Sequence, residues 1–427
     1  MSDTPRSGHV LASRALTNKR HNRSIALASM MLIVAALLLV ACGSSSGSSS
    51  SHGTTTSSRT TVSRWGVVGN KGAITQLQLD RPTAIAGIRG KVVQIATSNS
   101  DGYALTSTGA VYGWGVNSYG ELGDGQKTPY ETRAVHVEFP SGVTIKSLAN
   151  PMPFDAGLAI DSSGHAWGWG LNGLDDLCLS GLINARPEQL PLTDVTLATG
   201  ARTHALFDSK GALLACGSGD AGELGNGSTA SSSTPTPVVG FPAGGKVIAL
   251  TSSWEGSGAL LANGDYYDWG YNAAGQLGNG TAADSAVPVK VDLPGPVRQV
   301  FQGGSGPKNG QTVTILRDGD TWAWGDNDRG QLGIGTVTSS DVPVRVHVPK
   351  GVTFVAVSSG GFASYGIDQT GRLWAWGDNR SGQLGTGLIP QSATLPVDVR
   401  IHLSQVSSTA QNVAGTGGPA RTEDLGL

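Results

Sequence analysis

Few side chains in this 427-residue sequence have the residue type and the spacing that catalysis requires. His204 lies in Thr203-His204-Ala205-Leu206, with no nucleophilic Cys or Ser motif beside it. A hydrogen-bonded structural histidine is therefore favoured over a general base. Asp101, Asp155 and Glu255 could serve an enzyme only if the fold gathers them, because they are scattered singly along the sequence. We expect no catalytic residues and no enzyme activity.

Three segments look like metal or cofactor motifs but lack a required part. Asp326-Asn327-Asp328-Arg329-Gly330 begins like a calcium loop, but Val337 stands where the twelfth position needs a bidentate carboxylate. The segment 217–222 matches the dinucleotide pattern without the amphipathic helix that must follow it. The segment 240–246 resembles a phosphate loop until Val247 replaces the required Ser or Thr. The sequence predicts neither a metal site nor a cofactor.

The overall composition indicates an all-β protein and argues against nucleic-acid binding. Glycine supplies 63 of the 427 residues, about double ordinary usage, and charged residues make up only 14%. Much glycine with few Lys and Glu favours short strands and tight turns over helices. The net charge is −2 and no Lys/Arg run follows residue 23, so we expect no nucleic-acid partner.

The first sixty residues read as an export signal and a tether. Basic residues precede the uncharged apolar run 25–41, which is the layout of a secretory signal. Leu39-Val40-Ala41-Cys42 resembles the lipobox of bacterial lipoproteins, in which the cysteine is lipidated and becomes the mature N-terminus. Residues 1–42 are thus predicted to be a signal peptide with lipidation at Cys42. An uncleaved membrane anchor and plain secretion are the alternatives.

A lipidated protein would be exported and held in the cell envelope, on the outer side of the cytoplasmic membrane or on the outer membrane. Residues 43–60 are rich in Ser, Gly and Thr and are predicted to be a flexible linker. About 16 such residues would hold the folded part roughly 20–24 Å from its anchor. The C-terminal tail, residues 416–427, is also predicted to be disordered.

A repeated β-hairpin dominates residues 61–415. Alternating apolar residues flank a turn glycine, and a Trp-Gly pair begins five residues after that glycine. The turn glycines are residues 109, 164, 211, 264, 319 and 371, and the Trp position holds Trp114, Trp169, Cys216, Trp269, Trp324 and Trp376. Successive units lie 47 to 55 residues apart, which indicates one structural unit with adjustable loops.

A second signature follows each hairpin. Gly-[Glu/Gln]-Leu-Gly recurs at residues 120–123, 222–225, 275–278, 330–333 and 382–385, and a proline-led strand such as 288–291 follows. Asn117, Asn172, Asn272, Asn327 and Asn379 follow Trp-Gly, where a side-chain amide can bond the loop backbone. Four strands in about fifty residues make one blade of a β-propeller.

These repeats resemble those of the regulator of chromosome condensation family, among them its bacterial alpha-tubulin suppressor-like members. The resemblance implies a seven-bladed propeller of four-stranded antiparallel blades. Six copies are nearly complete, and a seventh is present in halves, at 61–66 and 403–415. We predict that the two ends of the polypeptide share that blade and close the ring. Six blades is the alternative.

Two cysteines depart from the repeat. Cys178 replaces a turn glycine of one unit, and Cys216 replaces the tryptophan of the next. In an exported protein the two could form a disulfide, but the sequence does not supply the geometry, so their pairing stays open.

Aromatic residues in the loops between the first and second strands are the candidate partner contacts. Phe154, Trp254 and Phe362 fall outside the repeated pattern, in loops that should converge on one rim. Exposed aromatic residues there would suit protein binding. The alternative is that they cap the channel or pack beneath their own loops.

We therefore expect a monomeric protein-binding propeller at the cell surface, with a protein partner whose identity the sequence does not give. One alternative is a secreted enzyme inhibitor, by resemblance to propellers that inhibit β-lactamases. Another is guanine-nucleotide exchange, the activity of the family's namesake. Family members with that activity insert a wedge hairpin in one blade, and no interval here exceeds 55 residues.

Overall fold

The computed structural model describes residues 63–68, 77–98, 101–174, 176–179, 181–242, 244–304, 306, 309–380, 382–386 and 392–402. Cys42 and the rest of the predicted signal, the linker 43–60 and the tail 416–427 lie outside these residues. Within them the secondary structure consists of β-strands and turns, and no helix has the length and apolar character needed to span a membrane.

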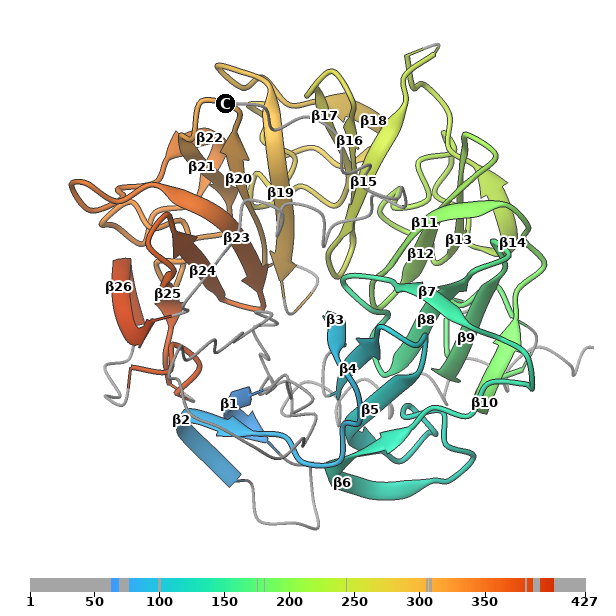
Figure 1. Ribbon diagram of the computed structural model, residues 1–427. Coiled ribbons are helices and arrows are strands. Elements are labelled where there is room, and N and C mark those ends of the chain that lie inside the picture. The colour runs from blue at the N-terminus through green and yellow to red at the C-terminus, as the bar shows by residue number, and fades with distance from the viewer. Residues whose placement is uncertain are drawn as a thin grey trace, which may run out of the picture.

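Six four-stranded sheets stand around a common centre like the blades of a propeller (Figure 1). Each sheet is antiparallel, and its strands follow one another in sequence order. We number these sheets blades 1 to 6. The strands of the first three blades are β3 (Val92–Thr97), β4 (Asp101–Thr106), β5 (Val111–Asn117) and β6 (Thr128–His136); β7 (Ile145–Leu148), β8 (Ala156–Asp161), β9 (Ala166–Leu171) and β10 (Ile183–Gln189); and β11 (Val195–Gly200), β12 (His204–Ser209), β13 (Ala212–Gly217) and β14 (Ser232–Pro237).

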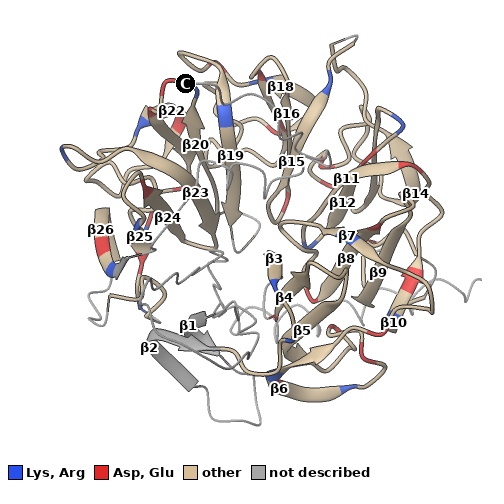
Figure 2. Cartoon of the chain, in the orientation of Figure 1, with Lys and Arg blue, Asp and Glu red and all other residues tan. Residues whose placement is uncertain are grey.

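The last three blades repeat the arrangement. Their strands are β15 (Val247–Ser252), β16 (Gly256–Leu261), β17 (Tyr266–Gly270) and β18 (Ser285–Lys290); β19 (Val297–Gly304), β20 (Gly310–Leu316), β21 (Thr321–Gly325) and β22 (Ser340–Arg345); and β23 (Phe354–Gly360), β24 (Ala363–Asp368), β25 (Arg372–Asp378) and β26 (Ser392–His402). Figure 2 shows Lys, Arg, Asp and Glu spread over all six blades, with most of the ribbon uncharged.

The predicted blade number is wrong. Seven four-stranded blades were expected, whereas the described residues form six, the alternative that the sequence left open. The matching fragment near the N-terminus forms β1 (Ser63–Val68), and it pairs with β2 (Leu77–Ala84) in a separate two-stranded sheet. This sheet lies between blades 6 and 1 in Figure 1. The segment 403–415, which was to complete a seventh blade, lies outside the described residues.

Tryptophans join neighbouring blades and form much of the core. The indole Nε1 of Trp169 donates a hydrogen bond to the backbone oxygen of Glu121 in the preceding blade, at 2.8 Å. The same bond recurs three times, from Trp269 to Glu223, from Trp324 to Gln276 and from Trp376 to Gln331. The turn glycine beside each indole is required, because a Cβ on Gly225 would lie 2.7 Å from Nε1 of Trp269.

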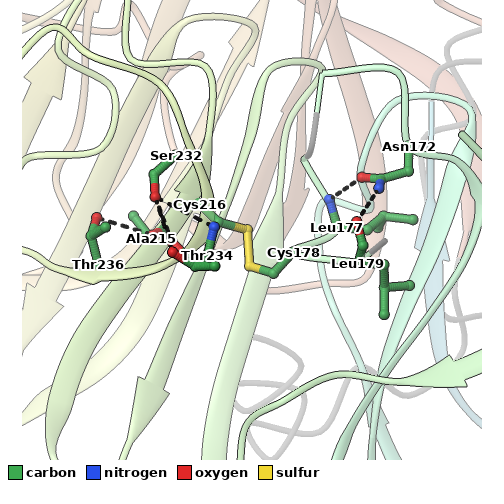
Figure 3. Close-up of a disulfide and its surroundings, with 9 residues drawn as sticks. All are labelled: Asn172, Leu177, Cys178, Leu179, Ala215, Cys216, Ser232, Thr234 and Thr236. Carbon is green, nitrogen blue, oxygen red and sulfur yellow. Dashed lines mark hydrogen bonds between the residues drawn. A yellow bond between two sulfur atoms is a disulfide. The ribbon is translucent and has the colours of Figure 1, made fainter. Parts of the chain in front are cut away.

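The interface between blades 2 and 3 is built differently. Cys178 and Cys216 occupy the turn-glycine and tryptophan positions, and the structure joins them in a disulfide with Cα atoms 5.7 Å apart (Figure 3). Cys178 keeps the left-handed backbone of the glycines it replaces, with φ of 52° against 61° at Gly225. Both cysteines are buried. A covalent bond therefore fills the place that an indole fills at four other interfaces.

The repeated asparagines hold the outer turns, as predicted. The Asn172 side-chain oxygen accepts the Leu177 backbone N–H at 2.9 Å, beside the disulfide (Figure 3). The equivalent bond runs from Leu122, Leu277, Leu332 and Leu384 to the asparagines at 117, 272, 327 and 379. The Asp-Asn segment at 326–328 belongs to one such turn, and Asp326 accepts hydrogen bonds from that turn's own Gln331 and Asp328.

Candidate functional site

Three loops meet at the rim of blades 2, 3 and 4. They are the β7–β8, β11–β12 and β15–β16 connections, each between the first and second strand of its blade. The Phe154 N–H donates to the Ala201 oxygen at 3.1 Å, which ties the first loop to the second. The Ser252 hydroxyl donates to the Gly200 oxygen at 2.7 Å, which ties the strand before the third loop to the strand before the second. These bonds between blades fix the loops relative to one another.

The three loops bring two aromatic rings and one guanidinium together. The rings of Phe154 and Trp254 pack edge to face, with centroids 5.1 Å apart. The Cζ atom of Arg202 lies over both rings, 4.9 Å from the Phe154 centroid and 4.4 Å from the Trp254 centroid. All three side chains are partly buried. We call Phe154, Arg202 and Trp254 the loop cluster; each residue comes from a different blade.

A buried series of polar side chains holds the Trp254 backbone. His204 is fully buried, with Nε2 at 2.7 Å from the Ser257 hydroxyl and Nδ1 at 2.9 Å from the Thr203 hydroxyl. The Thr203 hydroxyl also lies 2.7 Å from the Trp254 oxygen, and the Ser257 hydroxyl lies 2.8 Å from the Glu223 oxygen. A neutral imidazole carries one N–H, so one of these hydroxyls donates to the ring and the other donates to its carbonyl. Burial lowers the His204 pKa to about 3, so the ring is neutral at ordinary pH. His204 thus positions the loop cluster and has no access to a substrate.

Carboxyl groups surround the Arg202 guanidinium. Asp155, Asp176 and Glu255 act on it electrostatically, while burial is the largest influence and lowers its pKa. Burial raises the Asp176 pKa to about 8. Burial, followed by the charge of Glu223, raises the Glu255 pKa to about 7. Near neutral pH, protons on Asp176 and Glu255 reduce the negative charge around Arg202.

The cluster includes two of the three predicted contact residues. Phe154 and Trp254 touch each other, whereas Phe362 lies in the β23–β24 loop of blade 6 and has no ring contact with them. The Phe362 oxygen instead accepts the Asp378 N–H at 2.8 Å. Sequence reasoning missed Arg202; its only signal was its position next to Thr203 in a loop between first and second strands.

The arrangement suits recognition better than bond chemistry. Asp155 and Glu255, scattered in the sequence, both face Arg202, but Asp101 is fully buried in blade 1. Within the described ranges no group of three or more His, Cys, Asp or Glu is placed to hold a metal ion. Two rings and a guanidinium on fixed loops offer apolar area and planar hydrogen-bond donors.

Comparisons with known proteins identify the repeat. Residues 210–260, 263–306, 318–367 and 370–415 match the family model described as the regulator of chromosome condensation (RCC1) repeat. A second model of this repeat matches residues 354–383. The protein therefore carries RCC1 repeats, and its homologues are RCC1-like propellers.

Among its relatives is the ultraviolet-B receptor UVR8 of Arabidopsis thaliana, 28% identical over 72% of this chain and 70% of the receptor. The E3 ubiquitin-protein ligase HERC2 of Mus musculus is 27% identical over 70% of this chain, but the match spans only 6% of the ligase. The crystal structure of human WBSCR16 superposes with a TM-score of 0.67 at 21% identity, covering 78% of this chain and 89% of that one.

The crystal structure of Prp20p from Saccharomyces cerevisiae, described with its binding properties to Gsp1p and histones, gives the same TM-score of 0.67. Its identity is 20%, and the match covers 79% of this chain and 85% of that one. Both structural likenesses establish the propeller fold.

Proposed function

We propose that this protein, with its RCC1 repeats, is a protein-binding module that holds its partner through the loop cluster and performs no catalysis itself. The observation that supports this is the convergence of Phe154, Arg202 and Trp254 from three blades. Aromatic residues and arginine supply most of the binding energy of protein interfaces. Loops fixed before binding also lose less conformational entropy when a partner arrives.

Capture of the partner tests this proposal. The full-length protein, tagged at its C-terminus, is expressed in its own cells, cross-linked and purified, and the bound protein is identified. Phe154→Ala and Trp254→Ala should each weaken binding at least tenfold, because truncation of a central aromatic residue typically costs about 2 kcal/mol or more. Leu395→Ala is the control, since Leu395 is 44% exposed on β26 in blade 6. Capture of the partner by Phe154→Ala and Trp254→Ala at the level of wild type and of Leu395→Ala would refute the proposal.

We further propose that the module acts in the cell envelope, anchored through a lipid on Cys42. The apolar run that ends at Cys42 supports this, together with the Ser/Gly/Thr-rich stretch that follows. Cys42→Ser should move the protein from the membrane fraction to the soluble exported fraction, with the propeller unchanged by circular dichroism. If mass spectrometry of the purified wild-type protein detects no attached lipid, the proposed anchor is contradicted.

The identity of the captured protein also decides a narrower form of the proposal. An enzyme whose activity falls when the propeller is added would make this protein an inhibitor. A partner whose activity is unchanged would make it a scaffold. An inhibitor and a scaffold would both bind the partner through the loop cluster, so both require Phe154 and Trp254.

A further inference from the structure

We infer that Arg202 anchors the partner by binding a carboxylate, from an Asp or Glu side chain or from the carboxyl terminus of the partner. This inference rests on the proposed function and specifies the chemistry that the loop cluster recognises.

The first support is the contrast between Arg202 and other arginines. The Arg298 guanidinium donates to the backbone oxygens of Phe354 and Val355, at 3.2 and 3.3 Å. Arg380 makes two hydrogen bonds to the Asp378 carboxylate. Among the described residues Arg202 has ring partners and no hydrogen-bond or ion-pair partner. Its five N–H donors thus make no hydrogen bond to a described residue, and the carboxyls of Asp155, Asp176 and Glu255 act on its charge from beyond ion-pair distance.

The second support is the fit between a guanidinium and a carboxylate. The Arg202 Cζ atom lies over the rings of Phe154 and Trp254, whose planes are inclined by 69°, so the guanidinium can stack flat on at most one of them. Rings are weak hydrogen-bond acceptors, so the N–H donors at the edge of the guanidinium remain for a ligand. A planar fork of donors matches a carboxylate with two parallel hydrogen bonds. A cationic partner would instead compete with Arg202 for the same two rings. The carboxyls of Asp155 and Glu255 would attract such a partner, so a lysine peptide is included in the test.

The carboxyls around the cluster set its pH dependence. Asp155 and Asp176 face Arg202 from blade 2, and Glu255 faces it from blade 4. Glu223, Asp284 and Asp220 in turn face Glu255. With pKa values of about 8 and about 7, Asp176 and Glu255 lose their protons as the pH rises through this range. Their negative charge would then repel an incoming carboxylate, so affinity should fall from pH 6 to pH 9.

Three blocked peptides test the inference directly. They share one neutral sequence and differ in carrying two glutamates, two glutamines or two lysines. Binding to the ¹⁵N-labelled full-length protein is followed through the Trp254 indole N–H signal, assigned with Trp254→Phe. The glutamate peptide should shift this signal, and the other two should leave it unchanged. Equal or stronger binding of the lysine peptide would overturn the inference.

Variants assign the effect to the guanidinium. Arg202→Gln should weaken the glutamate peptide at least tenfold, because a charged hydrogen-bonded pair is worth about 1.5–3 kcal/mol. Arg202→Lys keeps the charge but loses the planar fork and should bind with intermediate affinity. Arg345→Gln, at an exposed arginine already paired with Asp320, is the control. Unchanged binding in Arg202→Gln would overturn the inference, as would no shift with the glutamate peptide in wild-type protein.

Two further measurements separate this inference from the proposed function. Glu255→Gln should flatten the fall in affinity between pH 6 and pH 9, and an unchanged profile would contradict the role of that carboxyl. If capture of the partner requires Phe154 and Trp254 but not Arg202, the proposed binding function holds and the carboxylate inference is refuted. If capture requires none of the three residues, the proposed function itself is refuted.

Discussion

Blades 1–3 and blades 4–6 have the same strand topology but carry different side-chain types at one turn position. The first half has Glu121, Asp176 and Glu223 where the second half has Gln276, Gln331 and Gln383. The Glu121 side chain accepts the N–H of the residue two before it at 2.7 Å, and the Gln276 side chain accepts the equivalent N–H at 2.8 Å. A carboxyl and an amide therefore perform the same structural task.

The other polar atom of each side chain distinguishes the halves. The Gln331 amide donates to Asp326 at 2.8 Å. Glu121 Oε1 and Asp176 Oδ1 are buried and have no hydrogen-bond partner in the described part of the protein. A buried carboxylate without a donor is costly, so burial raises the pKa of Glu121 and Glu223 to about 7 and that of Asp176 to about 8. An acid that takes up a proton can thus occupy the position that an amide occupies in the other half.

The halves also differ in how blades are joined. The first half contains the Cys178–Cys216 disulfide, whereas both blade interfaces within the second half use an indole hydrogen bond. The first half should therefore respond to reductant, and at this turn position it carries three titrating acids where the second half carries amides.

The largest effect should come from breaking the disulfide. Cys216→Ser opens a loop with a sequence separation of 38 residues, and the free energy of unfolding should fall by about 2–4 kcal/mol. Urea denaturation with and without reductant measures this loss. Wild-type protein should be destabilised by reductant and the variant should not.

A repair variant sharpens the same test. Cys178→Gly with Cys216→Trp restores the pair that other interfaces use, and it should recover stability while becoming insensitive to reductant. The donor and acceptor geometry for this bond exists at the blade 3–4 interface, where Trp269 reaches Glu223 at 2.8 Å. If the double variant is no more stable than Cys216→Ser, the interface between blades 2 and 3 accommodates the disulfide but not the glycine and indole pair.

The next effect concerns the buried acids. The Glu121 pKa rises from 4.5 to about 7 on folding, so stability present below pH 4.5 is lost as the pH climbs to 7. Glu121→Gln removes this loss and should raise the free energy of unfolding at pH 8 by about 2–3 kcal/mol. At pH 4 variant and wild type should match.

The reciprocal substitution places an acid at the amide position of the second half. Gln331→Glu should lower stability at pH 8 and add to the pH dependence of the second half, because the Asp326 carboxyl accepts from the Gln331 amide. A stability difference from wild type that is equal at pH 4 and pH 8 would show that the two halves differ in more than this side chain.

A smaller effect of opposite sign should come from the boundary between the halves. The His204 pKa falls from 6.5 to about 3 on folding, so stability present above pH 6.5 is lost as the pH drops. Between pH 7 and pH 5 this loss is about 2 kcal/mol, and His204→Gln should remove most of it. Thermal unfolding at the two pH values measures the difference; an unchanged slope would place the acid sensitivity elsewhere.

The smallest effect should not distinguish the halves. Arg186 pairs with Glu138 in the first half, and Arg345 pairs with Asp320 in the second, all at exposed positions. Arg186→Ala and Arg345→Ala should each change stability by less than about 1 kcal/mol, and less still in high salt. A large loss in only one half would contradict the assignment of the difference to buried groups.

Much of the fold followed from local patterns. The turn glycines and the Trp-Gly pairs predicted the hairpins, because both depend on backbone angles and strand alternation within one unit. The blade number did not follow, because the partner of the segment 61–66 is set by contacts that no local pattern records. The Glu/Gln difference was visible in the sequence, but only the fold reveals that Glu121 Oε1 is buried without a donor among the described residues.

The site was predictable only in part, for a similar reason. Phe154 and Trp254 stood out because they break the repeat. Their contact depends on the angle between blades, as does the position of Arg202 against both rings. Phe362 breaks the repeat equally, yet its loop belongs to blade 6. A departure from a repeat marks a residue as unusual without telling which neighbours it meets.

The indole bonds between blades all run in one direction, from a later blade to an earlier one. The polypeptide emerges N-terminus first, whether from a ribosome or from an export channel, so each acceptor oxygen emerges before the tryptophan that binds it. Every new blade can then dock on the blade before it, in the order of the sequence.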